Sequence, residues 1–188
     1  MDFGTLQVKA NAYKTVLNNT VHYRSEWNRL IKPMIHSTLN DILKACELKG
    51  EVKNQDNIEN LEAVILDLGK SSSGISENLE GSDVKRTMVK SNGAIIYQQL
   101  FNGKIMVMLM SPYIEGYGEP KPPKTLEILR PDELNKPFIL RHFELFLKDI
   151  TEWEDFDDDQ PTTKSNIGFN PIGYHTEEHI QADSVLEK

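Results

Sequence analysis

Apolar positions recur at helical spacing through about residues 21–49. The stripe consists of Trp27, Leu30, Ile31, Met34, Ile35, Leu39, Ile42, Leu43, Cys46 and Leu48. Steps of three and four residues place these side chains on one face, so we predict a long helix. Pro33 removes a backbone donor and clashes with the preceding turn, which predicts a kink or a restart. Gly50 stands where a helix-ending glycine is common, and Cys46 is expected in the core as a small hydrophobe.

Shorter apolar runs predict strands that are separated by polar loops. Leu61–Leu68 is a strand candidate that ends at Gly69, and Val84–Lys90 is a weaker one. The Asn-rich residues 51–60 and the Ser- and Gly-rich residues 70–82 have the composition of loops. We therefore expect both polar stretches to lack regular structure.

The clearest segment is a β-hairpin at Gly93–Met110. Two β-prone runs flank Asn102-Gly103, a dipeptide that suits a two-residue type I′ turn because both of its residues accept a positive φ. A two-residue turn sets the register of the strands. It predicts that Tyr97 lies opposite Met108.

The second strand of this hairpin is apolar at every position from 105 to 110, whereas a strand with one wet face alternates. One face is expected to meet helices, and the other to meet more of this chain or a second chain. Met106, Met108 and Met110 alternate, so they share a face. Thioether-rich surfaces adapt to varied partners, which makes these methionines candidate partner contacts as well as candidate core residues.

A final helix is predicted from Pro137 to about Glu154. Its stripe consists of Ile139, Phe143, Phe146, Ile150 and Trp153. His142 is expected at its surface or boundary, and Leu126–Leu129 adds a short strand before it. Together these elements predict an α+β fold with N-terminal helices, a mainly antiparallel sheet of three to five strands around the Asn-Gly hairpin, and a C-terminal helix packed on the sheet.

Composition divides the chain into three parts. We expect residues 1–20 to form a polar N-terminal arm with one short helix near Val8–Leu17, and residues 21–154 to form a single α+β domain. We expect residues 155–188 to form an acidic, extended C-terminal tail with an apolar island at Ile167–Tyr174. A chain of 188 residues is long enough to bury a core without covalent staples.

The charge and the cysteine content limit which kinds of partner and which cellular compartment we expect. A net charge of -8 argues against nucleic acid and anionic membranes, because these polyanions attract basic surfaces. Cys46 is the single cysteine, so no intramolecular disulfide can form. The first residues lack the basic and apolar regions of a signal peptide, and no apolar run approaches the roughly 20 residues of a membrane span. We therefore expect a cytoplasmic protein.

Three motifs resemble chemistry-bearing patterns, and each lacks a requirement. His175–His179 fits the zinc pattern H-x-x-E-H but lies in the expected tail, away from a walled cleft. Gly69–Ser71 resembles the end of a phosphate-binding loop, but Val64 stands where that loop needs a glycine. Asp155–Asp159 begins like a calcium loop, but Gln160 replaces its glycine. We predict no metal, no cofactor and no catalytic residue.

The proline-rich segment Tyr113–Lys124 is the best candidate for a site. Glycine, tyrosine and proline together make a rigid, amphipathic contact surface, and an ordered loop of this length is often functional. The candidate contacts in it are Tyr113, Glu115, Tyr117, Glu119 and Lys121.

These patterns favour a non-enzymatic protein–protein interaction or assembly subunit, with a protein partner or self-association. The alternative is a small-molecule-binding protein or a hydrolase with its site under Tyr113–Lys124. A weaker third hypothesis, a nucleic-acid regulator, is disfavoured by the acidic charge.

Overall fold

The computed structural model describes residues 3–78, 85–117 and 119–155. The helical elements are α1 (Gly4–Glu26), the π-helical turn η1 (Trp27–Ile31), α2 (Lys32–Ala45) and α3 (Lys136–Glu154). The strands in the described part of the chain are β1 (Glu51–Gln55), β2 (Ala63–Asp67), β3 (Lys70–Asn78), β4 (Lys85–Ser91), β5 (Ala94–Gln99), β6 (Ile105–Met110), β7 (Tyr113–Ile114) and β8 (Lys124–Leu129). The α+β class is as predicted.

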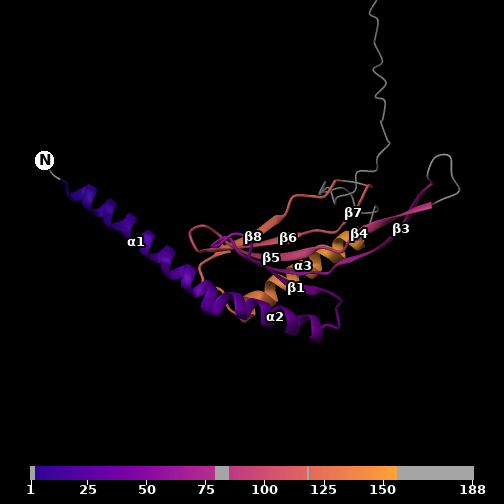
Figure 1. The fold of residues 1–188 in the computed structure, drawn as a ribbon, viewed down its shortest axis with the longest axis horizontal. Helices are drawn as coiled ribbons and strands as arrows, with labels where there is room; N and C mark the ends of the chain where they lie inside the picture. The colour runs from indigo at the N-terminus through magenta and orange to yellow at the C-terminus, as the bar shows by residue number, and fades with distance from the viewer. Residues whose placement is uncertain (1–2, 79–84, 118, 156–188) are drawn as a thin grey trace, which may run out of the picture.

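The strands form two antiparallel sheets, which are joined where two neighbouring strands run from one sheet into the other (Figure 1). The larger sheet has the order β1-β2-β5-β6-β8, and the smaller has the order β3-β4-β7. β2 leads into β3 at Gly69, and β4 leads into β5 at Gly93, so the chain passes between the sheets at these two glycines. The N–H of Leu68 donates to the carbonyl of Gly93 at 3.1 Å, and the N–H of Asn92 donates to that of Gly69 at 2.9 Å.

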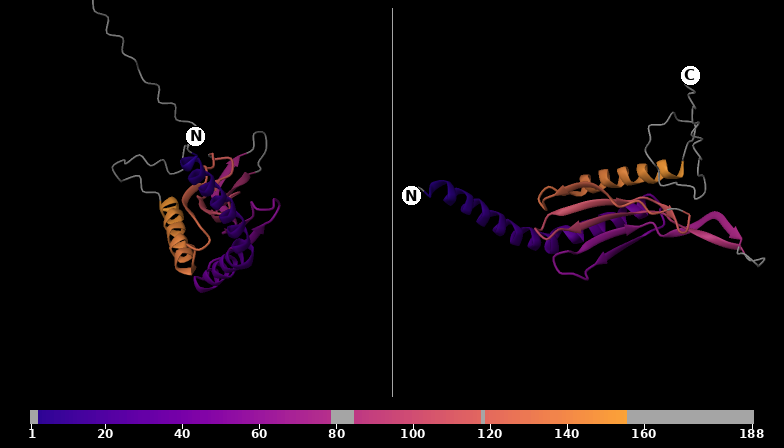
Figure 2. Two further views of the ribbon diagram at one scale, coloured as in Figure 1. Left: turned by 90° about the vertical axis from the view of Figure 1, so that its left-hand side faces the viewer. Right: turned by 90° about the horizontal axis from the view of Figure 1, so that it is seen from above.

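Helices α2 and α3 lie on the same face of the five-stranded sheet (Figure 2). The core between them and the sheet consists of Trp27, Ile31, Ile35, Leu39, Ile42, Leu43, Val64, Leu66, Ile95, Tyr97, Ile105, Val107, Leu109, Leu129, Leu134, Ile139, Phe143 and Phe146. This arrangement confirms that the helices pack on one sheet face. The helical spacing in the sequence identified most of their buried positions.

The predicted kink or restart at Pro33 corresponds to the π-helical turn η1, which directly precedes α2 in an unbroken helical segment. The wider turn lies next to the position where the proline removes a backbone donor. The end of α2 differs from the prediction. The helix stops at Ala45, and Glu47 rather than Gly50 takes a left-handed φ of 53°. Cys46 therefore falls in the turn after the helix and is exposed, so its expected place in the core is wrong.

Several stretches that were predicted as loops form strands. β1 lies within residues 51–60, β3 occupies most of 70–82, and β7 lies in the proline-rich segment. Their residues have weak strand propensity, but pairing with β2 and β4 satisfies their backbone groups. At the N-terminus, α1 extends well beyond the expected short helix at Val8–Leu17.

The hairpin at Gly93–Met110 is confirmed, but its turn has three residues rather than two. Gln99 pairs with Ile105, and residues 101–103 form the loop beyond them. Gly103 has a φ of +76°, whereas Asn102 does not take a positive φ. This is a type I turn followed by a glycine bulge instead of the predicted type I′ turn.

The longer turn shifts the register of the strands by one residue. Tyr97 lies opposite Val107, and Met108 lies opposite Ile96. Because side chains alternate between faces, the pairing decides which residues share a face. Met108 shares a face with Ile96 and lies away from buried Tyr97.

Candidate interaction surface

One face of the five-stranded sheet carries a central apolar patch, with Lys53, Gln98 and Thr125 beside it, and has no helix over it in the described part of the chain (Figure 2). Ile65, Ile96 and Met108 form one row across β2, β5 and β6. Met106 and Ile128 face each other across β6 and β8 in the next row. We call this surface the open sheet face and define it as Ile65, Ile96, Met106, Met108, Met110 and Ile128.

The side chains of the open sheet face are partly accessible. The three methionines, Ile65 and Ile96 are half-buried among their neighbours, and Ile128 is 52% exposed. The structure places Met106, Met108 and Met110 together on this face. Their expected contact with a partner stays a prediction.

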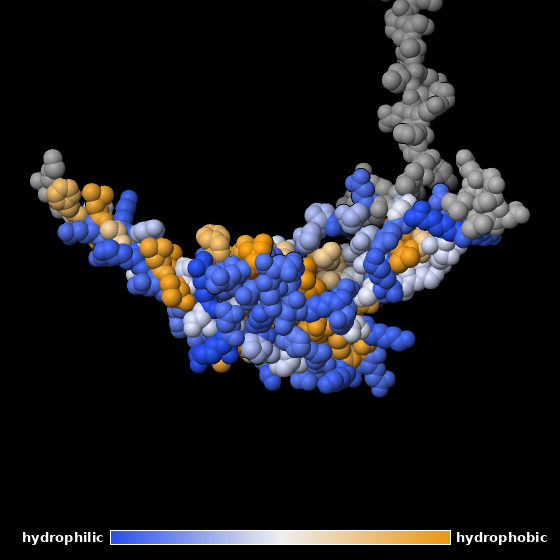
Figure 3. All heavy atoms as spheres, viewed as in Figure 1, coloured by the Kyte–Doolittle hydropathy of each residue, from blue (hydrophilic) through white to orange (hydrophobic). Residues whose placement is uncertain are grey.

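Helix α1 is the second exposed apolar surface. It projects beyond the sheet (Figure 1), and every residue from 3 to 19 is exposed. Apolar side chains are visible along it in Figure 3. The large ones are Phe3, Leu6, Val8, Tyr13, Val16, Leu17 and Val21. Single apolar residues on a surface are ordinary, but extended apolar patches mark interaction sites.

The C-terminal part of α1 is anchored to the folded domain. The Arg24 guanidinium donates to the carbonyl of Phe101 at 2.6 Å. The hairpin loop comes so close that a Cβ at Gly103 would lie 3.1 Å from the backbone nitrogen of Arg24. Trp27 is fully buried, and its indole N–H donates to the Glu62 carboxylate at 3.0 Å. These contacts fix the direction in which the rest of α1 projects.

The proline-rich segment contributes in a different way. Tyr113 and Tyr117 are half-buried, and Glu119 and Lys121 are exposed. Glu115 forms an ion pair with Lys70 at 2.5 Å, which ties the segment to β3. The role of these five residues in binding stays a prediction.

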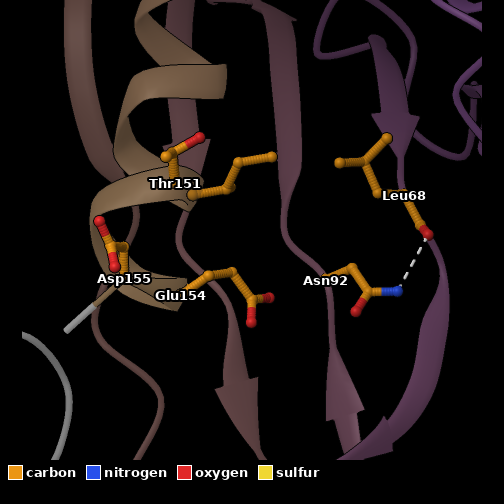
Figure 4. Close-up of a pocket in the computed structure, with 6 residues that line it drawn as sticks. Leu68, Asn92, Thr151, Glu154 and Asp155 are labelled. Carbon is orange, nitrogen blue, oxygen red and sulfur yellow. Dashed lines mark hydrogen bonds between the residues drawn. The ribbon is translucent and has the colours of Figure 1, made fainter.

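A hollow of about 370 Å³ lies where the end of α3 meets the bend between the two sheets (Figure 4). It is lined by Leu68, Asn92, Ile150, Thr151, Glu154 and Asp155. The carboxamide of Asn92 donates to the carbonyl of Leu68 at 3.3 Å, and Glu154 pairs with Lys90 at 2.5 Å. The six lining residues include no histidine or cysteine, and the Lys90 ammonium beside Glu154 is held in that ion pair.

A polar network lies inside the core. His142 is fully buried; its Nδ1 is 3.2 Å from the Tyr97 hydroxyl, and its Nε2 contacts the Glu127 carboxylate, which also accepts from Arg141. The expected surface position of His142 is wrong. His142 follows Ile139 by three residues, and that spacing is the signal in the sequence that places it on the buried face of α3.

Burial lowers the pKa of His142, although Glu127 acts in the opposite direction. Burial alone would raise the pKa of Glu127, but hydrogen bonds from His142 and Arg141 outweigh it and hold this pKa below its usual value. A neutral imidazole that donates from Nε2 to Glu127 and accepts from Tyr97 satisfies both ring nitrogens. The His142 ring is fully buried, whereas the Glu127 and Arg141 side chains at the edge of this network are 25% and 52% exposed.

In the part of the chain that the structure describes, no cluster of three or more His, Cys, Asp or Glu side chains is arranged to hold a metal ion. The predicted zinc-like motif at His175–His179 lies outside the described residues, as do residues 156–159 of the acidic motif and the C-terminal tail after Asp155. Each helix within the described ranges is too short or too polar to cross a membrane.

Comparisons of this chain with protein-family models, with curated proteins and with solved structures find no match.

Proposed function

We propose that this protein is a non-enzymatic binding or assembly subunit, which engages another protein molecule through α1 and the open sheet face. The observation that carries this proposal is the exposure of α1. The helix has 23 residues, and none of them is buried. A helix of about 35 Å that contacts its own domain only near its C-terminal end is unusual in a folded domain.

The free energy of an isolated helix explains why this exposure matters. Helix nucleation is unfavourable, so most helices in proteins are stabilised by packing of an apolar face. The first turn of α1 has no side-chain cap, and asparagine, threonine and valine, which have low helix propensity, recur along it. A partner that covers its apolar side chains would supply the missing packing.

The open sheet face supports the same proposal. It presents branched apolar side chains beside three flexible methionines, a combination that adapts to varied contact surfaces. Its three methionines come from β6, and the alternate side chains of that strand are buried in the core.

The proposal is tested by affinity capture of the full chain from cells of its source, with quantitative mass spectrometry. The variant Leu6→Ser/Tyr13→Ser/Leu17→Ser removes three exposed apolar side chains from α1. Asn11→Ser/Thr15→Ser/Asn18→Ser is the matched control, because it changes three exposed polar side chains of the same helix and no apolar one.

We expect specific proteins, or tagged copies of the chain itself, to be captured by the wild type and the control and lost from the triple variant. The melting temperature should stay nearly unchanged in all three, because these side chains are outside the core. Identical captured sets for all three proteins, or none for any, would contradict a binding role for α1.

A further inference from the structure

Five apolar residues at the start of the N-terminal helical segment lie at a regular spacing, while Val8, Val16 and Val21 lie outside it. Phe3, Leu6, Ala10, Tyr13 and Leu17 follow one another at steps of three, four, three and four residues. This is the heptad spacing of positions a and d in a coiled coil. We call these five residues the α1 seam. Phe3, Leu6, Tyr13 and Leu17 are 54, 62, 64 and 47% exposed.

The seam continues the face by which α1 contacts the folded domain. The same spacing leads from Leu17 through Thr20 and Arg24 to the buried Trp27. A Cβ at Gly103 would lie 3.1 Å from the carbonyl oxygen of Thr20, so the hairpin loop covers this face at that point. The loop ends there, and the seam is the uncovered extension of a face that is packed further along the helix.

The charges beside the seam indicate which kind of helix can cover it. Lys9 and Lys14 are the only charged side chains from residue 4 to 23, in a chain whose net charge is -8. In heptad terms they occupy positions g and e, which flank the seam and select the partner in coiled coils. Two parallel copies of α1 would place Lys9 of one opposite Lys14 of the other, and these like charges repel.

Building on the proposed function, we infer that the α1 seam forms a two-stranded coiled coil with an acidic amphipathic helix of a different protein. Glutamate or aspartate at the flanking positions of that helix would pair with Lys9 and Lys14. The seam is about 22 Å long, or about two heptads, which suits a weak and reversible contact.

The probe for this inference is a labelled synthetic peptide of about three heptads, with isoleucine at a, leucine at d and glutamate at e and g. A matched peptide carries lysine at e and g instead. Binding to the full chain is measured by fluorescence anisotropy at low and at moderate salt. We expect the acidic peptide to bind at least about tenfold more tightly than the basic one, with weaker binding at higher salt.

A charge reversal sharpens the test. The variant Lys9→Glu/Lys14→Glu should reverse the preference, so that the basic peptide binds more tightly. Leu6→Ser/Leu17→Ser should weaken binding of the acidic peptide to the wild-type chain by at least about tenfold. The double variant Asn11→Ser/Asn18→Ser, at two exposed polar positions of α1 off the seam, should leave it unchanged.

Three results would overturn the inference. The first is equal or absent binding of the two peptides, and the second is a preference that ignores the charge reversal. The third is a dimer of the wild-type chain in light scattering that Leu6→Ser/Leu17→Ser dissociates, because the seam is then occupied by a second copy. In each case the capture experiment above still decides separately whether α1 binds protein at all.

Discussion

At the scale of single residues, the hydrogen bonding of buried polar side chains decides how a substitution in the core changes the stability of the protein. His142 has a partner for each ring nitrogen, whereas the side-chain amide of Gln99 is fully buried and hydrogen-bonds to none of the described residues. A buried polar group without a partner reduces stability, and a fully paired one is costly to disturb. Substitutions at these two positions should therefore have opposite effects.

His142→Gln should reduce the loss of stability on mild acidification. Burial lowers the pKa of His142 in the folded protein, so the unfolded chain binds a proton first as the pH falls. The free energy of unfolding of the wild type is then lost as the pH drops below the ordinary imidazole pKa of about 6.5. Urea unfolding of both proteins at about pH 7.5 and pH 5.5 measures the difference.

The control for the histidine-to-glutamine substitution itself is His22→Gln, at an exposed position outside the core. At neutral pH, His142→Gln itself should cost about 1–3 kcal/mol, because it disrupts the contacts with Tyr97 and Glu127. An equal pH dependence for His142→Gln and the wild type would contradict a depressed pKa.

Gln99→Met should stabilise the protein by about 1 kcal/mol, because it replaces an unpaired buried amide with an apolar side chain of similar size. Gln98→Met is the control, since Gln98 is half-buried on the opposite face of β5 and should change the free energy of unfolding little. Denaturant unfolding measures both. If Gln99→Met were less stable than the wild type, the Gln99 amide would have a hydrogen-bond partner outside the described residues.

At the scale of elements, the contact between α1 and the β5–β6 hairpin depends on one glycine. Gly103 combines a φ of +76° with a close approach, because a Cβ there would lie 2.6 Å from the Cβ of Tyr23. Gly69 has nearly the same φ, +75°, but no heavy atom lies within 4 Å of such a Cβ. A comparison of alanine substitutions at Gly69 and Gly103 therefore separates the cost of backbone strain from the cost of a steric clash.

Gly69→Ala should cost about 1–2 kcal/mol through its left-handed backbone alone. Gly103→Ala should cost about 1–3 kcal/mol more, because α1 must move away from the hairpin. Urea unfolding curves of both variants check this order. Equal costs would mean that α1 does not press on the loop in solution.

Amide hydrogen exchange should divide the long N-terminal helical segment into two parts. Residues 4–19 have no buried contacts and should exchange rapidly, whereas the buried stretch of α2 around Ile35–Leu43 should exchange slowly. Mass spectrometry of the free chain provides the measurement. Slow exchange in both parts would indicate that α1 is already covered, for example by another copy.

At the scale of the whole molecule, two helices cover one face of a sheet whose other face carries an apolar patch. Neighbouring residues on β6 therefore belong to different environments: Leu109 is 1% exposed, whereas Met108 is only half-buried. This asymmetry is the structural basis for treating the open sheet face as a contact surface. It also makes β6 the best place to test the layer arrangement.

Met108→Gln should cost less than about 1 kcal/mol, because its side chain keeps access to water. Leu109→Gln should cost about 3–5 kcal/mol, because it buries an unpaired amide in the core. Thermal and urea unfolding of the two variants compare the faces directly. A Met108→Gln variant as unstable as Leu109→Gln would mean that the open sheet face is covered within the chain.

The sequence by itself determined the elements whose signals are local. The apolar stripes of α2 and α3 follow helical periodicity, and Pro33 and Pro137 mark where those helices begin. The hairpin and the strand at β2 were also predicted at their places. These patterns predict the elements correctly because the buried face of a helix or strand requires apolar side chains at the period of that element.

Only the tertiary structure decided features that depend on distant neighbours. The polar strands β1 and β3 exist because β2 and β4 supply their hydrogen bonds, and composition alone does not reveal such partners. The hairpin register followed from a three-residue loop packed against α1, which placed Met108 on the open sheet face. For the candidate surface, the sequence indicated the methionines but not α1, because exposure of a helix is set by where the rest of the fold ends.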